Sequence, residues 1–383
     1  MAEKRRKNGD GVLIKNPSGS FSIRKRYQIG DKITRKCFTG KTQSEAKKKM
    51  QQFENEHRLN PNYNYNQEIL CDYMENWAKL YKSKSVKATT YDTIDATISR
   101  IKKYDIAFYQ LNQLNSDKFQ YFFHQLVEDK YSLETIKKTY NHINSCLKKA
   151  ESKGDVNKNP LSDVELPSEE NVLTKSKSIQ IFDDDDIKKI YLEAYRTSPS
   201  GKYKYQHGAA IVFMLYTGLR IGECIGLEWG NVDMEKKCIY VNTTVSIVKD
   251  HENGGYKENI STTKTKKSTR TVPLSNRAIE ALKIAKQQNA TPSIVFQSGT
   301  GTRINARNVS RCLESILTNA GTKLEQAGLH ALRHTFASKL IRKKVDIKII
   351  SELLGHKKVS TTYDIYAHLI EGETQMAISV LDE

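Results

Sequence analysis

Six residues in the C-terminal half of the chain carry side chains that together could cut a phosphate diester: Arg220, Lys264, His330, Arg333, His356 and Tyr366. The first five are cations or potential cations, which stabilise the negative charge that builds up on a phosphate under attack. A guanidinium grips two phosphate oxygens at once, which a lysine cannot do. A phenol attacks well once cations stabilise its phenolate and a base accepts its proton. The set therefore predicts phosphoryl transfer to a tyrosine.

The sequences around Arg220, His330 and Arg333 are typical of residues held in fixed positions. Arg220 follows an apolar helical segment, 209–215, and a glycine, Gly218, that permits a sharp turn. Glu223, three residues on, is within reach of the guanidinium. His330 and Arg333 are three residues apart, on one face of an expected helix, and can point at the same phosphate. We expect the adjacent His334 to face elsewhere and to be structural.

His356 and Tyr366 complete the set. His356 comes directly after Gly355, where an expected helix ends, so its side chain is held on a loop. Tyr366 lies ten residues further on, in TTYDIYAHL. Tyr363, three residues earlier in the same segment, is the rival nucleophile on local reasoning.

Four segments that contain these residues resemble the conserved boxes of the tyrosine recombinases, the lambda-integrase family: TGLRIGECIGL, HALRH, LLGH and TTYDIYAHL. The resemblance covers roughly residues 180–370. It implies that Arg220, the His330–Arg333 pair and His356 bind the scissile phosphate of duplex DNA. It also implies that Tyr366, rather than Tyr363, forms a 3′-phosphotyrosine, without metal or other cofactor.

The same resemblance implies a general acid on a β-hairpin ahead of the segment RTVPL. Lys264 in TTKTKKSTRTVPL fits that place best, with Lys266 and Lys267 as rivals. The family cuts and rejoins DNA as a homotetramer on two sites, and the larger integrases use an excisionase and a DNA-bending protein as accessory partners. The lysine-, asparagine- and isoleucine-rich composition suggests an AT-rich bacterial host, with a prophage or conjugative transposon as the source.

The charge of the chain agrees with a DNA partner. There are 62 Lys and Arg against 44 Asp and Glu, a net charge of +18, and a chain this basic is expected to bind a polyanion. Residues 1–60 hold 16 of the basic and 6 of the acidic residues, so more than half of the excess lies there. This asymmetry indicates a separate basic module, although a solvated lysine-rich surface would give the same count.

The basic module is expected to be a small β-sheet followed by a helix. Phe21, Ile23 and Tyr27 alternate with polar residues, and Gly30-Asp31 suits a hairpin turn. Thr42 and Glu45 form a capping box at the start of the helix. We expect the hairpin to contact DNA through five residues: Arg24, Lys25, Arg26, Arg35 and Lys36. The alternative is a minor β-domain with solvated basic residues.

The overall prediction is a multidomain, mainly α protein with small β-sheets. The resemblance to the larger integrases implies an arm-type DNA-binding domain at 1–60, a helical core-binding domain at 66–162 and an α+β catalytic domain at 179–383, with a linker expected at 163–178. Aromatic residues of the helical domain form its core, and Lys84 and Lys87 are candidate DNA contacts. In the catalytic domain, 238–248 and 261–272 predict two strands, and the remainder predicts helices.

The last predicted helix, about 373–381, is apolar on one face and could dock on its own domain or on a neighbouring protomer. The six cysteines are scattered without metal-ligand spacing, which argues against structural zinc and favours reduced thiols in a cytoplasm. The sequence has no run of 18 apolar residues, so no membrane span is predicted. Two rival functions remain: a type IB topoisomerase, and a DNA-binding regulator with an inactive catalytic fold.

Overall fold

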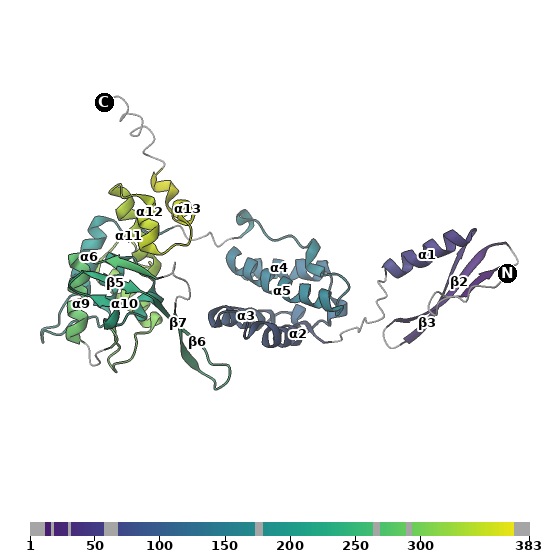
Figure 1. Ribbon diagram of the computed structural model, residues 1–383, viewed down its shortest axis with the longest axis horizontal. Coiled ribbons are helices and arrows are strands. Elements are labelled where there is room, and N and C mark those ends of the chain that lie inside the picture. The colour runs from purple at the N-terminus through teal and green to yellow at the C-terminus, as the bar shows by residue number, and fades with distance from the viewer. Residues whose placement is uncertain are drawn as a thin grey trace, which may run out of the picture. The chain divides into compact units, whose positions relative to one another are not determined.

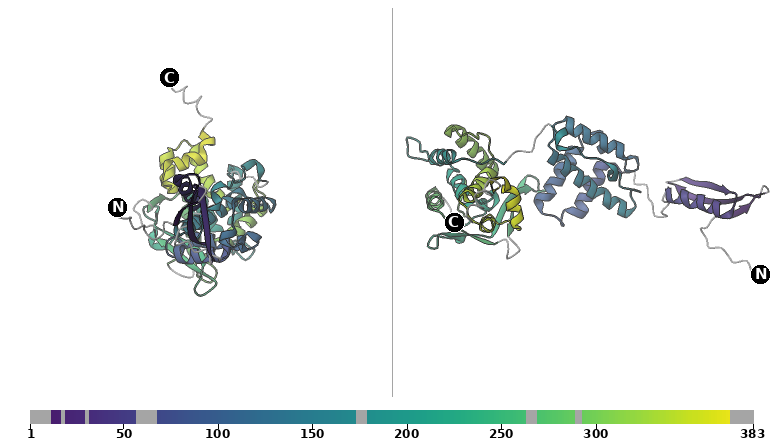
Figure 2. Two further views of the ribbon diagram at one scale, coloured as in Figure 1. Left: turned by 90° about the vertical axis from the view of Figure 1, so that its right-hand side faces the viewer. Right: turned by 90° about the horizontal axis from the view of Figure 1, so that it is seen from above.

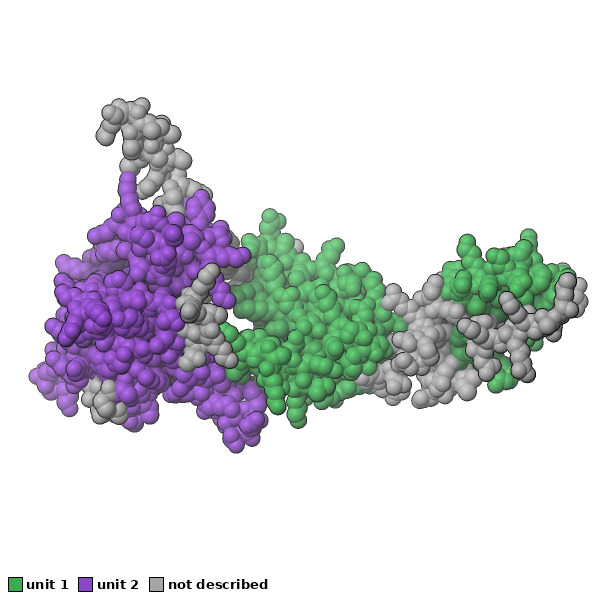
Figure 3. Space-filling view, in the orientation of Figure 1, with its two compact units in different colours: residues 1–176 green, residues 177–383 purple. Residues whose placement is uncertain are grey.

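The structure is a computed structural model that describes residues 12–16, 19–29, 32–56, 68–172, 179–262, 269–288 and 293–370. The chain divides into two compact units, residues 1–176 and residues 177–383 (Figure 3). The fold is mainly α-helical with small antiparallel sheets, as expected. Among the described helices, none has the length and hydropathy needed to cross a membrane.

The basic module is a three-stranded antiparallel sheet with one helix. Strands β1 (Val12–Lys15), β2 (Phe21–Ile29) and β3 (Lys32–Gly40) lie in that order, and α1 (Gln43–Glu56) follows. Ile29 pairs with Lys32, and the expected turn residues between them, Gly30 and Asp31, lie outside the described residues. The Glu45 amide donates to Thr42 Oγ1 at 3.1 Å, which caps α1. Ile23, Ala46 and Met50 form the small core between sheet and helix.

The five basic residues of this sheet are divided between its two faces. Side chains alternate along a strand, and Arg26 pairs with Arg35 while Lys25 pairs with Lys36. Arg24, Arg26 and Arg35 therefore share the face turned away from α1, and all three are exposed. Lys25 and Lys36 lie on the helix side, where the Lys36 ammonium stands 5.6 Å from the Phe53 ring centroid. The five residues expected to contact DNA thus lie on two faces of the sheet, because side chains of neighbouring strand residues point to opposite faces.

A helical bundle follows, with a core rich in aromatic side chains. It consists of α2 (Leu70–Trp77) with a π-helical turn (Ala78–Lys82), α3 (Ala88–Ile101), α4 (Ser116–Glu128) and α5 (Leu133–Lys153). Phe119, Phe122 and Phe123 are at most 1% exposed, which confirms their interpretation as core. Lys84 and Lys87 are exposed in the segment that leads into α3.

The bundle continues into the stretch that we expected to be linker. Gln120 of α4 exchanges two hydrogen bonds with the Glu165 backbone, at 2.9 and 3.0 Å. Val164 and Leu166 pack against the bundle core. These contacts hold at least residues 164–166 on the bundle, because apolar side chains of the segment find a surface to cover.

The second unit surrounds one buried helix. Its helices are α6 (Asp184–Ala194), α7 (Gly208–Thr217), α8 (Ile221–Ile225), α9 (Asn276–Gln288), α10 (Ala306–Ala320), α11 (Leu329–Arg342), α12 (Ile347–Leu354) and α13 (Val359–Ile370). α7 contacts α6, α9, α10 and α11, and nine of its ten residues are buried. A helix that is apolar on all sides belongs in a core. The yellow helices α12 and α13 lie side by side, as Figures 1 and 2 both show.

Two predicted strands of this unit are each divided. The chain forms β4 (Val232–Asp233), β5 (Cys238–Val241), β6 (Thr243–Lys249), β7 (Tyr256–Thr262) and β8 (Arg270–Pro273). β4, β5 and β8 form one sheet, whereas β6 and β7 form a separate hairpin (Figure 1). Only Asn242 separates β5 from β6. The chain therefore passes from one sheet to the other without interrupting the alternation of apolar and polar residues, and the sequence reads as a single strand.

Candidate active site

Two of the predicted arginines meet at the C-terminal end of α12. Arg220 is the N-cap residue of α8, and its Nη1 donates to the Leu354 carbonyl at 3.3 Å. Arg333, in α11, donates from Nη2 to the same carbonyl at 2.7 Å. The last carbonyls of a helix lack intrahelical partners and carry partial negative charge, so they attract guanidinium groups. Arg220 and Arg333, which are 113 positions apart in the sequence, therefore donate to the same carbonyl oxygen.

Gly218 makes room for this meeting. It ends α7 in the left-handed conformation, with φ of +65°, and its carbonyl accepts from Arg333 Nη1 at 2.7 Å. A Cβ atom here would overlap the Phe336 ring. Glycine is therefore required twice, by the backbone angle and by the close approach of α11.

A buried carboxylate ties Arg220 to a third arginine. Glu223, 7% exposed, accepts from the Arg220 backbone amide at 2.9 Å and from Arg220 Nη1 at 3.0 Å. Arg270 binds both Glu223 oxygens, at 2.8 and 3.0 Å, and donates from Nε to the Leu353 carbonyl at 2.8 Å. Burial would raise the pKa of Glu223, but the two arginines lower it to about 2. The carboxylate therefore stays ionised and fixes both guanidinium groups.

Arg333 is 4% exposed and still a cation at neutral pH. Burial is the main cause that lowers its pKa, to about 9, and the charge of Arg220 adds to it. Since that value lies above 7, the group keeps its proton. This buried charge persists beside the partly exposed Arg220 because two backbone carbonyls accept hydrogen bonds from Arg333 and the Glu223 carboxylate lies nearby.

His356 is held as a neutral imidazole beside Arg333. It follows Gly355, whose φ of +67° ends α12 and whose missing side chain lets Arg270 pass. Nε2 lies 2.9 Å from Arg333 Nη2, and Nδ1 lies 2.8 Å from Thr362 Oγ1. A guanidinium only donates, so Nε2 accepts and Nδ1 carries the proton. Burial, followed by the neighbouring arginines, lowers the pKa of His356 to about 4.

Tyr366 is packed beside this cluster. It is 1% exposed in α13, in a small core with Ile350 and Leu354 of α12. Its hydroxyl lies 2.9 Å from His334 Nδ1. Burial raises the pKa of Tyr366 to about 12, although Arg333 opposes the shift. Tyr363 is 51% exposed on the same helix.

The contact with Tyr366 corrects our expectation for His334. This residue does not face away from the site, because α13 crosses α11 on the side where His334 projects. His330, one turn earlier, keeps an exposed surface, and its ring centroid lies 6.4 Å from that of His334. Partial desolvation, followed by the charges of Arg333 and Arg220, lowers the pKa of His330. His330 thus stands at the edge of the cluster.

Residues 180–373 match the phage integrase family, and residues 69–166 match the phage integrase SAM-like domain. The chain belongs to the phage integrase family. A XerC-like tyrosine recombinase of Caldanaerobacter subterraneus subsp. tengcongensis is 31% identical over 376 residues, which cover 92% of each chain. The integrase of Staphylococcus phage L54a is 28% identical over 327 residues, 78% of this chain and 88% of that protein. This integrase is accordingly a site-specific recombinase.

Solved structures of integrases share the fold. The Tn1549 transposon integrase in complex with transposon right end DNA superposes with a TM-score of 0.68 at 18% identity, over 82% of this chain and all of that one. A lambda integrase dimer bound to a COC′ core site gives 0.59 at 16% identity, over 94% and 96%. Both matches extend across the bundle and the second unit, so the integrase fold includes both.

Lys264 lies outside the residues that the structure describes, as does the predicted C-terminal helix. The segment 263–268 joins β7 to β8, and β8 begins with Arg270. Arg270 itself was missed in the sequence, where we used its segment only to locate the lysine. An arginine at the start of a four-residue strand, bound to a buried glutamate that is distant in the sequence, has no local sequence signal.

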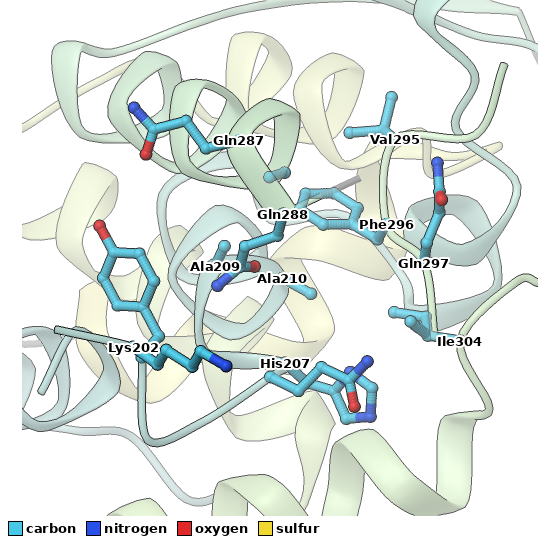
Figure 4. Close-up of a pocket in the computed structure, with 13 residues that line it drawn as sticks. Lys202, His207, Ala209, Ala210, Gln287, Gln288, Val295, Phe296, Gln297 and Ile304 are labelled. Atoms are coloured by element: carbon cyan, nitrogen blue, oxygen red, sulfur yellow. The ribbon is translucent and has the colours of Figure 1, made fainter. Parts of the chain in front are cut away.

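The integrase also has a cavity that is separate from the cluster. It has a volume of about 500 Å³ and is lined by residues such as His207, Ala210, Phe296 and Gln297 (Figure 4). His207 and Ala210 lie at the start of α7, whereas Arg220 follows the end of that helix. None of the arginines and histidines of the cluster described above lines it, so the cavity is a separate feature of the second unit.

Proposed function

We propose that this integrase cleaves and rejoins duplex DNA through a 3′-phosphotyrosine at Tyr366, to integrate and excise a mobile element. One observation carries the proposal. Arg220 and Arg333 share the Leu354 carbonyl, His356 touches Arg333, and Tyr366 lies on the helix that packs against α12. Cations and nucleophile thus come from separate segments to one place.

The arrangement supports electrostatic catalysis at a phosphate. Arg220 is 38% exposed and can turn its guanidinium to a non-bridging oxygen while its backbone stays fixed by Glu223. Arg333 contributes positive charge from the buried side of the site. His356 donates its Nδ1 hydrogen to the same oxygens once the ring turns away from Thr362. Preorganised donors of this kind stabilise the charge that develops on the pentacoordinate phosphorus.

The covalent step conserves the energy of the phosphodiester bond. Tyr366 attacks phosphorus, the bond to the 5′ oxygen breaks, and Lys264 protonates that oxygen. The 5′ hydroxyl of a second strand then attacks the phosphotyrosine and releases Tyr366. The reaction needs no nucleotide cofactor, because the tyrosine ester stores the bond energy.

A suicide substrate that loses its cleaved 5′ end tests the nucleophile, since the covalent adduct then accumulates. We expect Tyr366→Phe to bind DNA and to form no adduct. Tyr363→Phe is the matched control, because it removes a hydroxyl from the same helix, and it should form adduct normally. Adduct from the Tyr366→Phe protein would refute the proposal.

The N-terminal module and the bundle are proposed to bind DNA as well. We assign arm-type sites to residues 1–60 and core-type sites to residues 66–162, with Lys84 and Lys87 as bundle contacts and the linker ending at 178. In the sheet, Arg24, Arg26 and Arg35 form the open basic face. Substituting these three by alanine should weaken arm-site binding and reduce its salt dependence. Alanines at Lys25 and Lys36 are the matched control, with a smaller effect expected.

Assembly is the remaining part of the proposal. We infer a homotetramer on two DNA sites in the bacterial cytoplasm, aided by an excisionase and a DNA-bending protein. Mass measurement of the protein on paired sites, with and without residues 372–383, tests both the tetramer and docking by the C-terminal segment. A relaxation assay run beside a two-site recombination assay separates a recombinase from a topoisomerase.

A further inference from the structure

The Tyr366 hydroxyl has one described hydrogen-bond partner, the imidazole of His334. Nδ1 lies 2.9 Å from the hydroxyl, and the two rings meet edge to face with centroids 5.8 Å apart. The phenol is 1% exposed, and burial raises its pKa to about 12, so it carries its proton. A protonated phenol donates to an imidazole nitrogen that has a lone pair. Nδ1 is therefore the acceptor, and Nε2 carries the ring hydrogen.

The other two histidines of the site are less suited to accept this proton. His356 has both nitrogens engaged, with Nε2 toward Arg333 and Nδ1 toward Thr362. His330 lies at the rim of the cluster, and its ring faces that of His334 at 6.4 Å. A general base must be within hydrogen-bond reach of the proton that it removes. His334 meets that condition in the structure.

We propose that His334 is the general base that takes the Tyr366 proton when DNA is cleaved and returns it when DNA is joined. The inference rests on the proposed function, because it requires Tyr366 as nucleophile. In cleavage, the phenol proton passes to His334 Nδ1, the Tyr366 oxygen bonds to phosphorus, and the bond to the 5′ oxygen breaks with protonation by Lys264. In joining, Lys264 takes the proton of the 5′ hydroxyl as that oxygen bonds to phosphorus, the bond from phosphorus to Tyr366 breaks, and the departing phenolate recovers its proton from His334.

The charges around His334 suit a base that holds the proton only briefly. His330 and Arg333 face it from its own helix, His356 faces it from the loop after α12, and Tyr366 faces it from α13. Burial, followed by His330 and Arg333, lowers the pKa of His334 and keeps it neutral before the reaction. Charge building on the phosphate then favours the imidazolium. The protonated base is consequently most stable when the phosphorus is pentacoordinate.

His334→Asn separates proton transfer from hydrogen bonding. The asparagine amide occupies the place of Nδ1 and can accept the phenol hydrogen bond through Oδ1, yet it cannot take the proton. In a single-turnover assay on a suicide substrate, we expect adduct formation to slow by about 10²–10⁴-fold with DNA affinity unchanged. Should the asparagine protein fail to bind DNA, His334→Gln takes its place in the same assay.

Fluorotyrosine introduced at position 366 gives a readout that a purely structural role would not change. Its phenol is more acidic and therefore depends less on a base. Fluorotyrosine should raise the rate of the His334→Asn protein about tenfold or more, and it should change the rate of the protein with His334 intact very little. Fluorotyrosine at the exposed Tyr363 is the matched control and should recover nothing. With a 5′-bridging phosphorothiolate, whose leaving group needs no acid, the His334→Asn defect should persist while that of Lys264→Ala disappears.

The outcomes are separable. An unchanged or faster rate in His334→Asn would overturn the inference, since the contact would then be neutral or would restrain the phenol. Loss of the defect on the phosphorothiolate substrate would also overturn it, because His334 would be acting on the leaving group. Adduct from Tyr366→Phe in the same assay would instead overturn the proposed function, and the inference with it.

Discussion

Replacing Arg270 by alanine should expose how much the arginine cluster depends on one buried ion pair. Arg270 is 10% exposed and Glu223 is 7% exposed, and two hydrogen bonds of 2.8 and 3.0 Å join them. Removing one partner of such a pair costs about 3–5 kcal/mol, because the other charge is left buried. Arg220 and its backbone amide still bind Glu223, so we expect the lower end of that range at neutral pH.

The pKa of Glu223 gives an independent magnitude. Its value falls from 4.5 to about 2 in the folded protein. That difference, at about 1.36 kcal/mol per pKa unit, corresponds to about 3 kcal/mol of folding free energy. A depressed carboxyl pKa stabilises the fold above the unfolded value, and the contribution disappears as pH falls from about 4.5 toward about 2. The deficit of the alanine variant should therefore shrink across that window.

Chemical denaturation followed by tryptophan fluorescence measures this deficit. The chain has two tryptophans, and replacing Trp77 of the bundle by phenylalanine in every protein compared leaves Trp229 to report on the second unit. Arg307→Ala, at an exposed position of α10, is the control and should change the free energy of unfolding by less than about 0.5 kcal/mol. A deficit for Arg270→Ala below about 1 kcal/mol, or one that is independent of pH, would refute the reasoning.

Three further predictions concern single positions. Gly218→Ala should destabilise the second unit by more than about 1 kcal/mol, because of its positive φ and the overlap with Phe336, whereas Gly230→Ala, with open space around it, should not; thermal unfolding measures both. Arg220→Lys should lower the rate of adduct formation by about 10²–10³-fold while DNA binding persists. A normal rate in a cleavage assay would show that the two-pronged grip of the guanidinium is dispensable. Thr362→Val should cost about 1–3 kcal/mol by leaving the His356 Nδ1 hydrogen without its acceptor, and Thr361→Val, at an exposed position one residue earlier, serves as the control in the same unfolding measurement.

The helices of the second unit were largely predictable, because the periodicity of apolar residues and the glycines at helix ends can be read from a single sequence. The apolar segment 209–215 lies within α7, and Gly218 and Gly355 end their helices with positive φ. The β-region was less predictable. β5 pairs with β8 and β6 pairs with β7, but the alternation of apolar and polar residues continues from one to the other. They therefore look like one strand until the long-range pairing is known.

The site could be predicted as a set of residues but not as a network. Arg220, Arg333 and His356 were chosen for their chemistry, and the structure brings them within hydrogen-bond distance of shared atoms. Arg270 and His334 were missed because their roles depend on which element packs on which. Arg270 meets Glu223 only when β8 lies beside the end of α12, and His334 meets Tyr366 only when α13 packs on α11.

The charge balance of the cluster explains why so many cations are held around so few anions. Arg220, Arg270 and Arg333 carry three positive charges, which Glu223 and the C-terminal end of α12 offset by about one and a half. The remaining charge, about one and a half, exceeds the single negative charge of a phosphodiester, so the excess is offset only as the doubly charged phosphorane forms. A site that binds the transition state more strongly than the substrate accelerates the chemical step. Removing Glu223 should therefore strengthen ground-state DNA binding while slowing cleavage, because the arginines would lose their positions and keep their charge.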